Sequence, residues 1–189
     1  MRPARLLVTG AVSTATLGLL VDGRGDAARH ARQVDALGLG LLDLAGGGFW
    51  RLVTNLLVQP DPGVSAVVHL AALGVAEHRL GSRRALVLLV GGDWLSTLPL
   101  LIAVRGAATR GNADARRLSE ERDAGLSAGG SALVGALAVV LAPELRWMPA
   151  AAVVTSLAVP AITRRGRADV QHVAAAVVGV ALGRRWVSR

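Results

Sequence analysis

Six apolar segments, separated by arginine-rich stretches, leave this chain few ways to fold. Hydrophobic residues fill 52% of its 189 positions, which leaves too little polar surface to cover a water-soluble globule. The sequence therefore predicts an all-α membrane protein, a bundle of six transmembrane helices that forms one domain over residues 1–189. The expected spans are residues 6–21, 63–76, 85–104, 125–142, 148–163 and 170–183.

Several of these segments are only 14 to 16 residues long. A hydrocarbon core of about 30 Å needs about 20 apolar residues, so flanking polar residues must extend the helices or the bilayer must be thin. The first segment follows Arg2 and Arg5 and would also fit a secretory signal, but no small-x-small cleavage site ends it, which favours a retained span.

A long connection, residues 22–62, joins the first two spans. Its half-apolar piece, residues 36–44, is too short to cross and is predicted to lie at the interface or to re-enter the membrane, with Phe49 and Trp50 at headgroup level. The loop 105–123 alternates in charge, which is typical of a solvated amphipathic connector and also fits a cap over the segment that follows.

The chain has a net charge of +8, and all of its basic side chains besides histidine are arginines. In a membrane protein this charge indicates anionic lipid headgroups as partners rather than nucleic acid. Without cysteine there is no disulfide, thiolate metal site or cysteine nucleophile. No His, Asp and Glu residues have metal-ligand spacing, so we expect no metal and no cofactor. The dominance of Ala, Gly, Val, Leu and Arg is typical of a GC-rich bacterial genome, and we expect the protein in the bacterial plasma membrane.

Two polar residues lie at matching positions in the apolar segments. Ser127 is the third residue of 125–142, and His172 is the third residue of 170–183. One span lies between these two, so they must run in the same direction, and each residue lies roughly 3 to 5 Å below its helix start. Small residues such as Gly135 and Gly179 would let the two helices approach closely. A nucleophile and a base at one level predict serine-type peptide-bond chemistry within the bilayer.

The segment GLSAGGSALVGAL, with HVAAAVVGVALG beginning 45 residues after the serine, resembles the fourth and sixth helices of the rhomboid intramembrane serine proteases, and more closely those of the divergent rhomboid-like proteins of actinobacteria. Trp50-Arg51 with Thr54, and Glu77 with Arg79-Leu80-Gly81, add to a resemblance that covers residues 50–183. It implies a six-helix bundle that cleaves transmembrane protein substrates near their membrane entry point, in a water-filled cavity open to the outer face. Ser127 would be the nucleophile and also a backbone oxyanion donor, and His172 the general base.

The chain departs from the family pattern around this dyad. Ala128 and Ala175 replace glycines, and the chain has no tyrosine to stack on the histidine. The family's His and Asn on the second helix fall near Asp61 and Ser65, with His69 out of register. The sequence is therefore also consistent with a catalytically inactive relative that binds transmembrane helices without cleaving them. Supporting residues are expected at Gly125, Ser65 and Asp169, of which Asp169 either orients His172 or caps the sixth helix.

Two other interpretations remain open from the sequence. Gly125 and Gly129 also fit a small-xxx-small face that serves only helix packing. A small transporter or channel subunit would use Asp93 and His69 as polar lining, and it predicts that these two residues face a continuous aqueous path. Membrane orientation is undecided, because a cytoplasmic N-terminus places arginine-rich segments on both sides.

Overall fold

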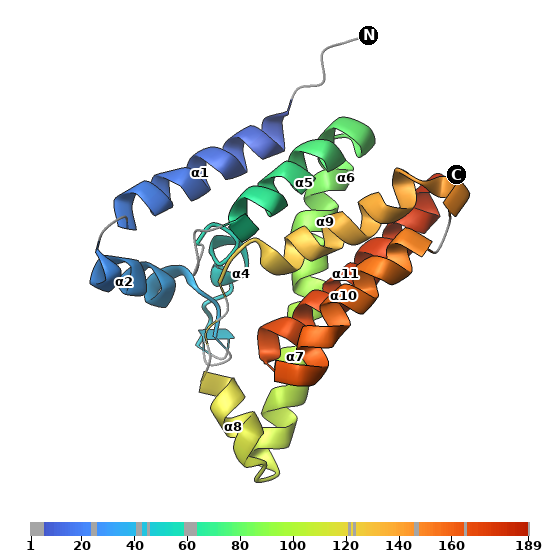
Figure 1. Ribbon diagram of the computed structural model, residues 1–189. Helices are drawn as coiled ribbons and strands as arrows, with labels where there is room; N and C mark the ends of the chain where they lie inside the picture. The colour runs from blue at the N-terminus through green and yellow to red at the C-terminus, as the bar shows by residue number, and fades with distance from the viewer. Residues whose placement is uncertain are drawn as a thin grey trace.

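The structure, a computed structural model, describes residues 6–23, 26–40, 43–44, 46–58, 64–120, 122, 124–145, 148–164 and 166–188 (Figure 1). All elements of this described part are helices, which confirms the predicted all-α class. In chain order they are α1 (Leu7–Gly23), α2 (Ala27–Leu37), α4 (Arg51–Thr54), α5 (Val64–Leu80), α6 (Ser82–Leu86), the π-helical turn η1 (Val87–Gly91), α7 (Gly92–Thr109), α8 (Ala113–Glu120), α9 (Ser127–Val140), the 3₁₀ turn η2 (Pro143–Leu145), α10 (Met148–Arg164) and α11 (Arg167–Val187).

Each of the six predicted segments coincides with a helix. The third corresponds to α6, η1 and α7, which form one continuous helix, Ser82–Thr109, of 28 residues. Within the described residues this is the one helix long and apolar enough to cross a membrane, while the apolar stretches Leu7–Asp22, Ser127–Val140 and Met148–Thr163 are shorter. The structure thus confirms that each predicted segment is helical. One of these helices is long enough to cross a membrane, and the other five crossings stay a prediction.

The connection between the first two segments differs from its prediction. An amphipathic helix, α2, lies earlier than expected, capped by Asp26, whose side chain accepts the Arg29 N–H. The chain leaves this helix at Gly38, which is extended, so residues 36–37 of the predicted piece 36–44 belong to the end of α2, and among its other described residues 43–44 are helical. The local reason is Asp43, whose carboxylate accepts the Gly40 N–H at 2.7 Å and holds a turn there. Phe49 and Trp50 are exposed, as a position at headgroup level requires.

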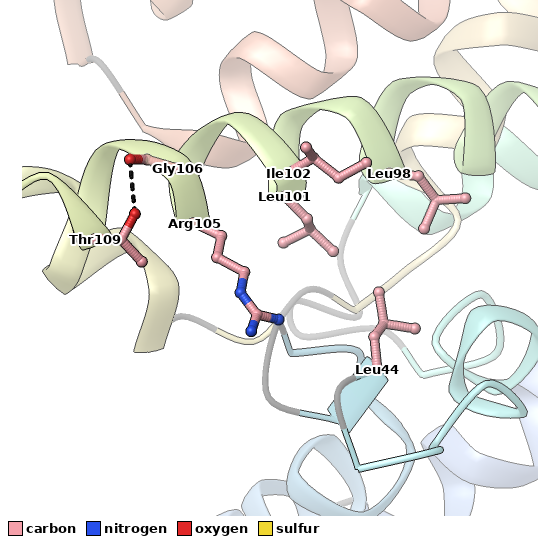
Figure 2. Close-up of a pocket in the computed structure, with 7 residues that line it drawn as sticks. All are labelled: Leu44, Leu98, Leu101, Ile102, Arg105, Gly106 and Thr109. Carbon is pink, nitrogen blue, oxygen red and sulfur yellow. Dashed lines mark hydrogen bonds between the residues drawn. The ribbon is translucent and has the colours of Figure 1, made fainter.

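A shallow groove runs along the second half of α7, beside Leu44 of this connection (Figure 2). Its volume is about 530 Å³. The lining is apolar except near Arg105 and Thr109, and the Thr109 hydroxyl donates to the carbonyl of Gly106. The lining residues are Leu44, Leu98, Leu101, Ile102, Arg105, Gly106 and Thr109.

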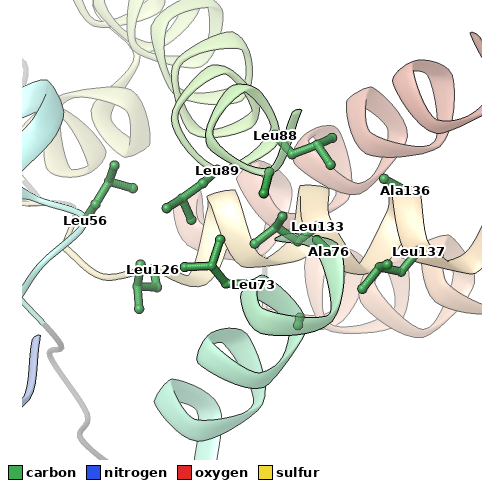
Figure 3. Close-up of a cluster of buried hydrophobic side chains, with 11 residues drawn as sticks. Leu56, Leu73, Ala76, Leu88, Leu89, Leu126, Leu133, Ala136 and Leu137 are labelled. Carbon is green, nitrogen blue, oxygen red and sulfur yellow. The ribbon is translucent and has the colours of Figure 1, made fainter. Parts of the chain in front are cut away.

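Helix α9 is the centre of the bundle, because its glycines let neighbouring backbones touch it. A Cβ on Gly129 would lie 2.3 Å from the carbonyl oxygen of Leu89 in η1, and one on Gly135 would lie 2.3 Å from the carbonyl oxygen of Ala176 in α11. Leucines and alanines fill the space that remains between α5, η1 and α9 (Figure 3). This cluster consists of Leu56, Ala72, Leu73, Ala76, Ala85, Leu88, Leu89, Leu126, Leu133, Ala136 and Leu137.

Two contacts bring helix ends together at one end of the molecule. Glu77, near the end of α5, binds the start of α1, and the Arg84 guanidinium in α6 lies 5.4 Å from the centroid of the Trp186 ring. Trp186 belongs to the last turn of α11, so the start of α1, the α5–α6 junction and the end of α11 lie together (Figure 1). This end of the molecule is opposite the starts of α9 and α11.

Glu77 stabilises the junction of α1 and α5. Its carboxylate accepts the backbone N–H groups of Val8 at 3.0 Å and Thr9 at 2.8 Å, together with the hydroxyls of Thr9 at 2.7 Å and Ser82 at 2.5 Å. A carboxylate at a helix start binds unpaired N–H groups and interacts favourably with the helix dipole. Burial raises the pKa of this carboxyl, but the hydrogen bonds from Ser82, Thr9 and Val8 outweigh burial and lower the pKa to about 2.

We expect Glu77→Gln to lower the free energy of unfolding by about 1.5–3 kcal/mol, the range for hydrogen bonds to a charged group. Because the folded pKa lies below the ordinary value of 4.5, the stabilisation is complete above pH 4.5 and is lost as the pH falls towards 2. Thermal unfolding in detergent, followed by circular dichroism, should show a steeper acid loss for the wild type than for Glu77→Gln. The exposed Glu144→Gln is the matched control, and equal acid slopes in wild type and Glu77→Gln would contradict the prediction.

Candidate functional site

Ser127 is the first residue of α9 and is half-buried. The chain turns into this helix at Gly125, whose φ of +113° lies in the region that favours glycine. The Gly125 N–H donates to the carbonyl of Asn55 at 2.7 Å. Gly125 therefore precedes the helix and supplies a turn, so Gly125 and Gly129 do not form one helix face. Of this pair, Gly129 alone has the packing role that the sequence also allowed.

The first long connection holds the segment that leads into Ser127. Arg122 pairs with Asp43 at 3.0 Å and with Asp35 at 3.2 Å. Arg51, part of the Trp50-Arg51 pair, donates to the carbonyls of Asp35 at 2.7 Å and Gly38 at 2.9 Å. These contacts position the start of α9. Sequence reasoning missed Asp43 and Arg122, because a pairing between two distant loops leaves no periodic signal.

Asn55 is a second group that sequence reasoning did not single out. Its side chain is fully buried, and within the described residues neither amide atom has a hydrogen-bond partner. Its backbone carbonyl binds Gly125, two residues before Ser127. A buried amide with free hydrogen-bonding capacity thus lies in the loop that adjoins the start of α9.

His172 lies in the second turn of α11 and is half-buried. Helices α9 and α11 touch where a Cβ on Gly179 would lie 1.9 Å from the carbonyl oxygen of Ala132, and one on Gly183 would lie 2.9 Å from that of Ala136. The two helices therefore run in the same direction, as their order in the chain predicts. Continued back to the start of α9, this register places Ser127 within about one turn of the level of His172.

His69 joins these two residues from α5. Its ring lies directly over Gly130, one turn after Ser127, where a Cβ would come within 2.2 Å of His69 Cδ2. By sequence counting His69 falls out of register with the family pattern, yet the structure brings it to the start of α9. The sequence signal for this contact was the pair Gly129-Gly130. Two consecutive glycines point to different sides of a helix, so each can make room for a different neighbour, here Leu89 and His69.

The other predicted supporting residues contribute less. Asp169 lies in the first turn of α11, with its carboxylate over Gly166 at the helix start, where a negative charge favours the helix dipole. Its two expected roles, capping of α11 and orientation of His172, stay predictions. Ser65 belongs to the first turn of α5, but its side chain lies outside the described residues, as does the whole of Asp61.

Buried polar side chains of α7 and α11, which we call the polar seam, lie next to His172. Gln171 Nε2 donates to Thr97 Oγ1 at 2.5 Å, and both side chains are buried. Asp93, one turn before Thr97, is fully buried, and Arg167 is buried and donates to the carbonyl of Leu118. Asp93 has no exposed surface, whereas a transporter lining would face water. The seam therefore serves helix association in this conformation.

The described grooves are apolar and lie apart from the dyad. Neither Ser127 nor His172 lines the groove along α7 in Figure 2. A second groove of about 290 Å³ lies between α9 and α10, lined by residues such as Leu137, Leu141 and Val153. Both grooves offer apolar surface of the kind that a lipid chain or a transmembrane helix contacts.

Comparison of the chain with protein-family models, with curated proteins and with solved structures finds no match. The resemblance to rhomboid proteases therefore stays a prediction from the motifs. Over the described residues, no group of three His, Asp or Glu side chains is placed to hold a metal ion.

Proposed function

We propose that this protein is a rhomboid-like intramembrane serine endopeptidase of the bacterial plasma membrane, with six spans, Ser127 as nucleophile and His172 as general base. The observation that carries the proposal is the register of α9 and α11. Their close contact at Gly179 and Ala132 keeps two parallel helices together, and the candidate nucleophile and base lie near the same end of both. Both residues are also half-buried, which suits groups that must reach a substrate.

In the proposed reaction Ser127 Oγ attacks the scissile carbonyl carbon of a transmembrane substrate while an imidazole nitrogen of His172 takes the hydroxyl proton. The first-turn N–H groups of α9, beginning with that of Ser127, have no partners within the helix, and in this proposal they donate to the oxyanion. His172 then gives the proton to the leaving amine, and water hydrolyses the acyl-enzyme. His69, whose ring packs on Gly130, is a histidine that α5 places near the start of α9.

A second candidate is a catalytically inactive rhomboid-like protein that binds transmembrane helices without cleaving them. Two observations favour it. Ala128, directly after the serine, is buried, so its methyl group takes up space next to the reacting centre. The apolar grooves along α7 and between α9 and α10 lie away from the dyad, where a bound helix would not be cut.

Reaction with a fluorophosphonate distinguishes the two. We expect the full chain in detergent micelles to react once, at Ser127, because this reagent needs a serine activated by a neighbouring base. Peptide mapping by mass spectrometry identifies the modified residue, and Ser127→Ala should abolish labelling. Ser156→Ala, which changes an exposed serine of α10, is the matched control and should label like the wild type. Absence of labelling in a folded protein would reject the protease and favour the inactive relative.

A further inference from the structure

One end of the molecule carries a dense group of exposed arginines, which we call the arginine end. They come from the last turn of α5, the first turn of α6 and the last turn of α11, which meet there. Its members are Arg79, Arg83, Arg84, Arg184 and Arg185, together with Trp186.

These arginines have no carboxylate partners among the described residues. The neighbouring acid, Glu77, is already engaged by Val8, Thr9 and Ser82. Some arginines elsewhere are paired with acids, as in the ion pairs of Arg29 with Asp22 and of Arg122 with Asp43. The arginine end is therefore a concentrated positive charge without an internal counter-ion.

The arginine end also contains a tryptophan that packs against the protein core. The Arg84 guanidinium lies 5.4 Å from the centroid of the Trp186 ring, within the range of a cation–π contact. Trp186 is half-buried and packs, with Leu80 and Leu182, against the same apolar core. Tryptophan prefers the boundary between hydrocarbon and headgroups, so its position sets the depth at which the arginines lie.

From this charge, this geometry and this aromatic anchor we propose that the arginine end is a binding site for the phosphate groups of anionic phospholipids. Guanidinium groups bind phosphate oxygens through paired hydrogen bonds, and their attraction to anionic lipid is strongest at a negatively charged leaflet surface.

We place this leaflet on the cytoplasmic side, because the negative surface potential that attracts clustered arginines belongs to the cytoplasmic leaflet. The starts of α9 and α11, with Ser127 and His172, then open towards the outer face. This inference rests on the proposed membrane arrangement and not on the reactivity of Ser127.

Titration of the purified full chain in an uncharged detergent tests the site. Dihexanoyl phosphatidylglycerol, dihexanoyl phosphatidylcholine and inorganic phosphate are added separately, and the unfolding midpoint is recorded. We expect phosphatidylglycerol to raise the midpoint, phosphatidylcholine to leave it unchanged, and phosphate to act far more weakly because it has no acyl chain. Arg83→Gln with Arg84→Gln should raise the phosphatidylglycerol concentration needed for a given midpoint shift by about 30-fold, from the usual contribution of two basic residues at a membrane surface.

The matched control is Arg32→Gln with Arg110→Gln, which removes the same charge from exposed positions elsewhere. An equal loss in both double variants would overturn the site, because it would show a general charge effect. Equal response to phosphatidylcholine, or to free phosphate, would overturn it as well.

The absence of cysteine provides an independent test of the leaflet. Ser188→Cys, next to Trp186, and Asn112→Cys, between α7 and α8, each create a unique thiol at an exposed position. In intact cells an impermeant maleimide should label Asn112→Cys alone and should reach Ser188→Cys only after permeabilisation. The reverse pattern would overturn the cytoplasmic assignment, whether or not Ser127 reacts with fluorophosphonate.

Discussion

Replacing His172 with alanine is expected to slow the reaction of Ser127 with fluorophosphonate by about 10²- to 10⁴-fold, the usual contribution of a general base. The serine hydroxyl is a weak nucleophile at its ordinary pKa and needs a neighbouring base to take its proton. His172 lies on the helix that runs parallel to α9 in close contact, so it is the side chain that the register brings to the level of Ser127. Time courses of labelling in the purified variants measure the rate.

The other histidines make this prediction specific. His78→Ala changes an exposed histidine at the other end of α5 and should label at the wild-type rate. His69→Ala should slow labelling less than His172→Ala, because in the proposed mechanism His69 packs on Gly130 and does not take the proton of Ser127. Added imidazole should restore part of the rate to His172→Ala, since it replaces the missing base. If His69→Ala showed the larger loss and the larger rescue, the base would be His69 and the assignment to His172 would be wrong.

The positions of the helices were predictable from the sequence, and the reason is local. A run of apolar residues between charged stretches has few alternatives to a buried helix, so segments such as 148–163 and 170–183 correspond closely to α10 and α11. The direction of α9 relative to α11 was also predictable, because one apolar segment lies between them. The order of the chain alone decides both features.

The surroundings of Ser127 were not predictable in the same way. His69 reaches α9 because Gly130 leaves room for its ring, a contact between residues 61 positions apart that follows no period. The attachment of Arg122 to Asp43 and Asp35 likewise joins two polar stretches whose charges alone suggest only solvated loops. Motif counting placed His69 out of register because it assumes a fixed number of residues between this position and the motif residues Trp50 and Glu77. Packing depends instead on where small residues let the backbones meet.

Among glycine-to-alanine substitutions at the described positions, Gly179→Ala is expected to cause the largest loss of stability. The new Cβ would lie 1.9 Å from the carbonyl oxygen of Ala132 and 2.7 Å from its carbonyl carbon. These are backbone atoms of the central helix, so no flexible side chain can move aside, and α9 and α11 must separate by about 1 Å or more. Overpacking of this kind costs about 1–3 kcal/mol in well-packed cores. Thermal unfolding of the variant in detergent, against the wild type, measures the loss.

The same substitution should also slow the labelling of Ser127, because the contact at Gly179 sets the spacing of the helices that carry Ser127 and His172. A displacement of about 1 Å between reacting groups can lower a rate by about 10²-fold. Gly10→Ala is the matched control, since nothing lies within 4 Å of a Cβ at that position of α1. There the higher helix propensity of alanine should leave stability unchanged or raise it by up to about 1 kcal/mol. If Gly179→Ala unfolded at the wild-type midpoint and labelled at the wild-type rate, α9 and α11 would not be in close contact. The dyad would then lose the one observation that supports it.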